Sequence, residues 1–286
     1  MLRSALLNVM IKAAQKASRD LKRDFGEIEQ LQVSVKGPAN FVSAADRRAE
    51  ETLRQELERA RPGYSFLGEE GGLQEGSDRT HCWVVDPLDG TLNFLHGIPH
   101  FAISIALERE GAVVAGVIYN PVSDEMFTAE RGKGAFLNER RIRVTGRTRF
   151  ADAVIACALP HPSRGDVALA RTEHNAVQEK IAGLRRFGAA ALDLAWVAAG
   201  RFDAYWERGL SPWDTAAGIV LVREAGGFVS DAEGREISLT SAGIVAGNET
   251  IHRELLRVIK QVDADIPATR SSVPRKQAEH RAFTKL

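Results

Sequence analysis

The chain has 286 residues, of which 44% are hydrophobic and 27% charged, so it is expected to be a globular protein with a large core rather than a disordered chain. Basic and acidic residues number 38 each, and this zero net charge gives no strong nucleic-acid signal and no sign of binding to an anionic membrane surface. The cysteines, Cys82 and Cys157, form no CxxC motif, which argues against disulfides or thiolate zinc and favours a reducing cytoplasm.

The N-terminal segment has the apolar spacing of a helix. Apolar residues recur at helical intervals over residues 2–21, which favours a first helix over a transit peptide, although residues 1–19 carry basic and no acidic side chains. A second helix is predicted over 43–60, ended by Arg61-Pro62-Gly63. No apolar run is long enough to predict a membrane-spanning helix.

Short apolar runs follow and predict strands. They lie at 64–67, 82–85, 101–107, 113–119, 125–129 and 134–137. Glu110-Gly111 separates two of these runs as a hairpin turn would. A largely antiparallel meander is therefore predicted.

Beyond residue 145, predicted strands alternate with predicted helices. Strands are predicted at 154–158, 184–187, 203–206 and 244–246, and helices at 166–182, 189–199, 212–225 and 248–262. This change predicts a boundary that divides an α+β half, residues 1–145, from an α/β half, residues 146–262. Residues 263–286 lack apolar periodicity and are expected to form a mobile tail. The fold class is α+β or mixed α/β, with helices that cover sheets.

The stretch WVVDPLDGTLNF, residues 83–94, places two carboxylates at the end of a predicted strand. Asp86 precedes Pro87 and should be extended, while Asp89-Gly90 makes the turn, so the two side chains can converge. Asp-Pro and Asp-Gly are also common turn dipeptides. The alternative is a site for a hard cation such as Mg²⁺, which binds carboxylate oxygens.

Three further motifs place acids at the ends of elements. Ser43-x-x-Asp46 and Ser211-Pro212-x-Asp214 have the pattern of a helix capping box. Glu69 and Glu70 follow another short strand, where a solvated loop is the simpler interpretation. Strand and helix ends are where binding sites are usually built, so these acids are also candidate ligands.

The sequence resembles the inositol monophosphatase family of magnesium-dependent, lithium-sensitive sugar-phosphate phosphatases. The motifs that match are Gly68-Glu69-Glu70, residues 86–94 and residues 213–218, in the family's order and approximate spacing. The resemblance extends from about Leu6 to Val262. It implies a layered αβαβα sandwich of the inositol monophosphatase and fructose-1,6-bisphosphatase type, usually a homodimer.

The resemblance also implies a metal site with two or three Mg²⁺ ions. Its ligands would be the carboxylates of Glu69, Asp86, Asp89 and Asp214 and the backbone carbonyl of Leu88. Thr91, paired with Asp46, would orient the attacking water, and Glu69 would help to hold a weaker third ion. Paired metals can stabilise both the entering and the leaving oxygen of an in-line displacement.

The phosphate and the rest of the substrate need separate contacts. If a helix opens at Gly90-Thr91, its free N–H groups face the phosphate, and glycine lets the backbone approach closely. The resemblance implies that the polyol contacts the following residues: Gly188, Ala189, Ala190, Glu207 and Asp214.

The predicted activity is hydrolysis of inositol 1-phosphate or a similar sugar or polyol phosphate. Gly71 and Ser211 depart from residues common in the family, which makes inositol specificity less secure than phosphatase activity. Alternative substrates are histidinol phosphate, fructose 1,6-bisphosphate and adenosine 3′,5′-bisphosphate, because fold alone does not separate them. Two further hypotheses are a transcription-associated partner protein with residual phosphatase activity and a binding module without turnover.

Overall fold

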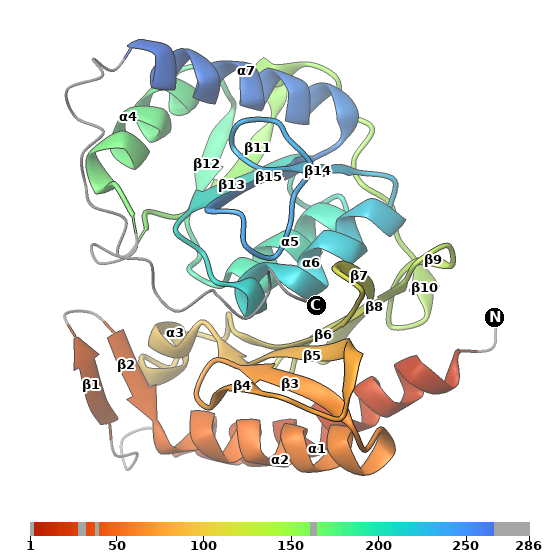
Figure 1. The fold of residues 1–286 in the computed structure, drawn as a ribbon. Helices are drawn as coiled ribbons and strands as arrows, with labels where there is room; N and C mark the ends of the chain where they lie inside the picture. Colours follow the sequence, from red (N-terminus) through yellow and green to blue (C-terminus); the bar gives the residue numbers. More distant parts are fainter. Residues whose placement is uncertain (1–2, 28–32, 38–39, 161–164, 266–286) are drawn as a thin grey trace.

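Two β-sheets alternate with three pairs of helices to give five layers (Figure 1). The computed structural model describes residues 3–27, 33–37, 40–160 and 165–265, with side chains described outside 28–43. The helices are α1 (Ala5–Gly26), α2 (Ala44–Ala60), α3 (Thr91–Leu95), α4 (Val167–Gln178), α5 (Ala190–Ala198), α6 (Pro212–Glu224) and α7 (Glu249–Asp265). The layer order is α1/α2, first sheet, α5/α6, second sheet, α4/α7, which confirms the predicted αβαβα sandwich.

The first sheet has eight strands in the order β10-β9-β8-β7-β6-β5-β3-β4. Its strands are β3 (Tyr64–Gly68), β4 (Gly72–Gln74), β5 (Asp78–Asp89), β6 (Ala102–Arg109), β7 (Ala112–Asn120), β8 (Glu125–Glu130), β9 (Gly134–Leu137) and β10 (Arg140–Arg141). From β5 to β10 every neighbouring pair is antiparallel, as the meander predicts, whereas β3 and β5 are parallel.

The second sheet has five strands in the order β12-β11-β13-β15-β14. Its strands are β11 (Val154–Cys157), β12 (Gly183–Arg185), β13 (Ala204–Arg208), β14 (Phe228–Ser230) and β15 (Gly243–Gly247). Strand β11 is parallel to both neighbours, and the other pairs are antiparallel. A separate hairpin pairs β1 (Val33–Gly37) with β2 (Asn40–Ser43), and a short 3₁₀ helix covers Phe150–Asp152.

Helices α5 and α6 form the central layer and are apolar on nearly all sides, because a sheet covers each of their two faces. Gly116 on β7 permits close packing, since a Cβ there would stand 2.7 Å from Val220 Cγ1 and 2.8 Å from the carbonyl of Ala217. The end of β5 meets the beginning of α5, where Asp89 accepts from the N–H groups of Ala190 and Ala191, and β6 meets the beginning of α6 through Ser104 and Trp213.

Several boundaries differ from the sequence predictions. Helix α1 begins at Ala5, and α4 ends at Gln178 because β12 begins only five residues later. Helix α7 continues to Asp265, three residues into the predicted tail, and 266–286 lie outside the described residues. No helix in the described part of the chain is both long and apolar enough to cross a bilayer.

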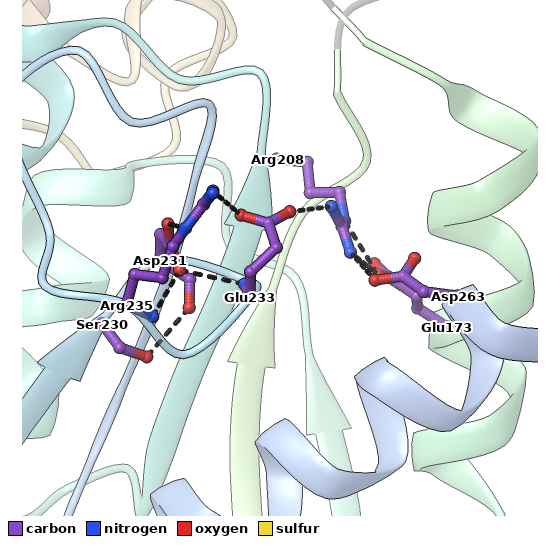
Figure 2. A network of polar contacts seen from close by, with 7 residues as sticks. All are labelled: Glu173, Arg208, Ser230, Asp231, Glu233, Arg235 and Asp263. Carbon is purple, nitrogen blue, oxygen red and sulfur yellow. Dashed lines mark hydrogen bonds and ion pairs between the residues drawn. The ribbon is translucent and has the colours of Figure 1, made fainter. Parts of the chain in front are cut away.

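A network of charged side chains fastens α4 and α7 to the second sheet (Figure 2). Arg208 on β13 contacts Glu173 of α4 at 2.7 Å and Asp263 of α7 at 2.8 Å. Glu233, in the loop after β14, lies 3.7 Å from Arg208 and also pairs with Arg235. Glu173 is fully buried, so Arg208 supplies the positive charge that balances a carboxylate without access to water.

Candidate active site

Strand β5 carries Asp86 and Asp89 at its carboxyl end and does not stop at Val85 as the sequence predicts. Asp86 and Asp89 are three positions apart, whereas their partners on β6, Ser104 and Ala102, are two positions apart, so β5 bulges here. The bulge accommodates Pro87, which has no N–H for the ladder. Inside it, the N–H of Leu88 donates to Asp86 Oδ1 at 2.9 Å.

Asp89 connects the first sheet to the start of α5. Its Oδ1 accepts from the N–H of Ala190 at 3.1 Å, and its Oδ2 accepts from the N–H groups of Ala191 at 2.9 Å and Leu192 at 3.3 Å. Free N–H groups at a helix start favour a negative charge. The Ala190 amide, predicted to face the substrate, thus donates to Asp89.

The hydroxyl of Thr91 lies between two acceptors at the start of α3. Thr91 Oγ1 is 3.2 Å from Asp46 Oδ2 and 2.9 Å from the carbonyl oxygen of Leu88. Asp46 lies in the first turn of α2 and is 1% exposed, so the predicted pair of Thr91 and Asp46 is in contact in the structure. The side chain of Ser43, the predicted cap of α2, is outside the described side chains.

The other two acids lie at the ends of different elements. Asp214 is at the third position of α6, and its Oδ2 accepts from the N–H of Ser211 at 2.6 Å, a bond of the predicted capping box. Glu69 directly follows β3, which runs parallel to β5. The parallel pairing places Glu69 at the same edge of the sheet as Asp86.

The electrostatics of Asp86 and Asp89 indicate that these acids gather in one place. Burial raises the pKa of Asp86 well above its ordinary value, and the neighbouring negative charges of Glu69 and Asp89 raise it further. Asp214 and Asp46 act on Asp86 in the same direction. Burial also raises the pKa of Asp89, with Asp214 as its strongest charged neighbour. The cluster thus concentrates negative charge in a largely dry region.

Gly90 and the start of α5 approach each other closely. Gly90 has φ +90° and directly precedes α3, which opens at Thr91 as predicted. A Cβ on Gly90 would stand 3.0 Å from the carbonyl of His100 and 3.1 Å from Ala189 Cβ. Gly188 also has a positive φ, +76°. Glycine is required at Gly90 both for the backbone conformation and for the space.

Glu207 lies on β13 and is buried beside Tyr205, whose hydroxyl donates to Glu207 Oε2. Burial raises the pKa of Glu207 to about 8; the Tyr205 hydroxyl opposes this shift, and the negative charge of Asp214 adds to it. Glu207 belongs to the second sheet, but it lies close enough to the acidic cluster for the charge of Asp214 to act on it.

Sequence reasoning missed Asp193 on α5. Its Oδ1 is 3.3 Å from His100 Nε2, its side chain is 1% exposed, and its charge acts on Asp89. Asn93 supports the same region, since its Nδ2 donates to the carbonyls of His100 and Phe187, each at 2.7 Å. An isolated acid in the apolar run AALDLAWVAA was the available signal for Asp193.

The donor set suits a hard divalent cation. Mg²⁺ prefers carboxylate, carbonyl and water oxygens, which are what Glu69, Asp86, Leu88, Asp89 and Asp214 offer. Within the described ranges, no group of three or more His, Cys, Asp or Glu side chains is placed so that it could hold a metal ion. Asp86 and Asp89 accept backbone N–H groups, but an ionised carboxylate has about four acceptor sites and can bind a cation as well.

The chain thus combines a five-layer αβαβα sandwich with acidic side chains at the ends of β3 and β5 and at the starts of α2 and α6. A sequence model of the inositol monophosphatase family matches residues 2–264. The chain therefore belongs to the inositol monophosphatase family.

Two relatives and one solved structure illustrate the similarity. The inositol-1-monophosphatase of Mesorhizobium japonicum is 60% identical over 91% of this chain and 98% of its own length. The Nus factor SuhB of Pseudomonas aeruginosa is 44% identical over 89% of this chain and 96% of its own. The crystal structure of the extragenic suppressor protein suhB from Bartonella henselae, 56% identical, superposes with a TM-score of 0.87 over 90% of this chain and 99% of that chain.

Proposed function

We propose that the chain is a Mg²⁺-dependent phosphomonoesterase that hydrolyses inositol 1-phosphate or a similar polyol phosphate by direct attack of water. The observation that carries the proposal is the convergence of acids from two layers of the fold. Asp86 and Asp89 are buried at the end of β5, Asp89 accepts from the start of α5, and the negative charge of Asp214 on α6 acts on both. Buried carboxylates that repel one another favour a divalent cation as their partner. The relative from Mesorhizobium japonicum is named for this activity.

Five groups would hold the metal ions. They are the carboxylates of Glu69, Asp86, Asp89 and Asp214 and the carbonyl oxygen of Leu88. The chemistry that bound Mg²⁺ supplies is charge stabilisation at the phosphoryl oxygens and a lowered pKa for water. The N–H groups of α5 fix the orientation of the Asp89 carboxylate, so that this ligand is prepared before the ion arrives.

Thr91 and Asp46 would position the attacking water and take its proton. The Thr91 hydroxyl has one proton to donate and two lone pairs that accept. When it donates to Asp46 Oδ2, 3.2 Å away, it can accept a hydrogen bond from water and move a proton toward Asp46. Gly90, Gly188, Ala189, Ala190, Glu207 and Asp214 would contact the phosphate and the polyol.

The direct test is phosphate release from inositol 1-phosphate by purified wild type, Asp86→Asn and Asp89→Asn, with and without Mg²⁺. Both substitutions remove a charge at nearly constant size, and at least about a hundredfold loss of kcat/KM is expected, about 2.7 kcal/mol of transition-state stabilisation. Asp152→Asn, at a partly exposed acid, is the control. Turnover retained by both variants at saturating Mg²⁺, with circular dichroism unchanged, would refute the site.

The substrate panel separates the alternatives within the family. Histidinol phosphate, fructose 1,6-bisphosphate and adenosine 3′,5′-bisphosphate are assayed beside inositol 1-phosphate, because the fold admits all four. Inhibition by Li⁺ is expected. A tenfold or greater preference in kcat/KM for another compound would replace inositol 1-phosphate as the proposed substrate.

We also propose a homodimer. Four exposed large apolar side chains lie beside two long-range hydrogen bonds. Leu92 precedes Asn93, whose side chain donates to the carbonyl of Phe187, and Ile98 and Val122 lie near the bond from Asn120 to the carbonyl of Pro99. Apolar side chains gathered on one surface are typical of an interface. Light scattering should give twice the chain mass of 31.2 kDa, whereas a single-chain mass at micromolar concentration would contradict it.

A cytoplasmic location is proposed from the two buried free cysteines, Cys82 and Cys157. Cell fractionation tests it, and recovery of the protein outside the cytoplasm would overturn it.

A second candidate function is a binding role in transcription. It is favoured by one observation, the 44% identity to a relative named Nus factor SuhB. Co-purification of Asp89→Asn with RNA polymerase and its elongation factors tests binding separately from turnover. Equal recovery of wild type and variant supports the role, and no recovery of polymerase subunits by either opposes it.

A further inference from the structure

A pocket of about 430 Å³ lies at the end of the first sheet opposite to the acidic cluster. Strand β5 passes His81 near its beginning, at this pocket, and reaches Asp89 at its last residue. Eight residues of strand at about 3.3 Å each separate the two by roughly 25 Å. The pocket is therefore distinct from the candidate active site.

Three arginines line this pocket, Arg61, Arg109 and Arg131. Among the residues that the structure describes, none of the three forms an ion pair; Arg61 Nη1 donates to the carbonyl of Ala60 at 2.7 Å. The N–H of Arg131 donates to the carbonyl of Val114 at 2.9 Å, which fixes the backbone from which this side chain extends. Guanidinium groups are planar, permanently charged and suited to phosphate or carboxylate oxygens.

The pocket also has a flat aromatic lining. The ring of Tyr64 stacks on His81 with centroids 4.4 Å apart and planes inclined by 8°. His81 Nδ1 lies 2.9 Å from Asp78 Oδ2, which holds the ring in place. In the ladder between β5 and β6, His81 is directly opposite Arg109, so an aromatic surface and a cation lie side by side.

Apolar side chains and one carboxylate complete the lining. Leu6, Leu107 and Val114 bring apolar surface from α1, β6 and β7. Glu130 Oε1 pairs with Lys133 at 2.5 Å, whereas Glu130 Oε2 is buried without a hydrogen-bond partner in the described part of the chain. A buried acceptor without a donor costs free energy that a ligand hydroxyl or amino group would recover.

We propose that this pocket binds a small organic phosphate with a flat, partly apolar body and a hydrogen-bond donor, of which a nucleoside monophosphate is the simplest example. The phosphate pairs with Arg109 and Arg131, the ring lies against Tyr64 and the apolar side chains, and the donor reaches Glu130. The volume falls in the range of ordinary small-molecule sites.

The test is calorimetric titration of the full-length protein with 5′-AMP in EDTA, which removes metal-mediated binding at the acidic cluster. Arg109→Gln/Arg131→Gln should weaken AMP binding at least about tenfold, because charge-assisted hydrogen bonds are lost. The control is Arg235→Gln/Arg257→Gln, which removes two exposed arginine charges far from the pocket, after β14 and on α7. Adenosine and inorganic phosphate should each bind at least about tenfold more weakly than AMP.

Several outcomes would overturn the proposal. The site is refuted if wild type does not bind AMP at millimolar concentration. It is also refuted if Arg109→Gln/Arg131→Gln binds AMP with unchanged affinity. Loss of AMP binding in Asp89→Asn would move the ligand to the acidic cluster. Inorganic phosphate that binds as tightly as AMP would refute the role of the organic body. Arg109→Gln alone is the second variant if the double substitution alters the melting temperature, and unchanged AMP affinity in it would also refute the site.

Discussion

The expected contribution of Thr91 to catalysis comes from a single group, its hydroxyl. Thr91→Val preserves the shape and removes the hydrogen bonds to Asp46 and Leu88. A fall in kcat of about 10²- to 10⁴-fold is expected, the usual contribution of a positioned proton acceptor. Steady-state kinetics measures it, with Thr91→Ser expected to restore most of the rate. Thr80→Val, at an exposed threonine, is the control, and a Thr91→Val enzyme above half of wild-type kcat would contradict the role.

Glu207 gives a prediction about pH and stability. Its folded-state pKa of about 8 lies above its ordinary value of 4.5, so the folded protein retains a proton that the unfolded chain releases between these values. This contribution to stability is complete below pH 4.5 and is lost as the pH rises through 8. Glu207→Gln removes the titration.

Urea unfolding of metal-free protein between pH 5 and pH 9 measures the effect. The free energy of unfolding of wild type should decline more steeply with rising pH than that of Glu207→Gln. Glu254→Gln, at a surface acid paired with Arg257, is the control and should follow wild type. Parallel curves for wild type and Glu207→Gln would show that Glu207 titrates normally.

Among the elements, α4 and α7 are joined to β13 by the ion pairs of Arg208, which lie beside an apolar core that includes Val177 and Ile259 (Figure 2). Arg208→Ala leaves the fully buried Glu173 without its counter-charge, and a loss of about 3–5 kcal/mol is expected. Denaturant unfolding measures this loss. Arg235→Ala, at a 70% exposed side chain, should destabilise the protein much less than Arg208→Ala, because water screens its ion pairs.

A double variant distinguishes loss of charge balance from loss of packing. Arg208→Ala/Glu173→Gln should recover a large part of the stability, because no uncompensated carboxylate remains. A double variant as unstable as Arg208→Ala would indicate that the arginine stem, not its charge, holds the helices.

The elements that could be predicted from sequence are those with a long apolar period. Helix α2, Ala44–Ala60, lies within one residue of its predicted bounds because it combines apolar spacing with clear end signals. Helix α6, Pro212–Glu224, is apolar on nearly all sides and was located by its end signals. Strands β4 and β10 have three and two residues, too few for any period. The end of β5 was predicted too early because the apolar run ends at Val85, whereas a bulge at Pro87 lets the strand continue to Asp89.

The acidic motifs are visible in the sequence, whereas the contacts that connect them are not. Each acidic motif is a local pattern in the sequence. In the structure, negative charges from other elements raise the pKa values of Asp86 and Asp89. The hydrogen bonds from α5 to Asp89 join positions about a hundred residues apart, and no local pattern encodes them. The pair of His100 and Asp193 is long-range for the same reason.

At the scale of the whole molecule, the layers place one acidic and one basic site at opposite ends of the first sheet. The acidic cluster lies where the ends of β3 and β5 meet the starts of α5 and α6, and the pocket of Arg109 and Arg131 lies at the other end. The sandwich is therefore the framework that brings together acids from α2, the first sheet and α6.

The measurement that tests the central claim most directly is anomalous diffraction from crystals grown with Mn²⁺, as a substitute for Mg²⁺, and inorganic phosphate. The account predicts at least two anomalous peaks at about 2.0–2.3 Å from oxygens of Glu69, Asp86, Asp89 and Asp214, with phosphate beside Gly90 and Thr91. The account would be contradicted if, at saturating Mn²⁺, no anomalous peak appeared beside these carboxylates. It would also be contradicted if the four carboxylates lay at separate positions away from the phosphate.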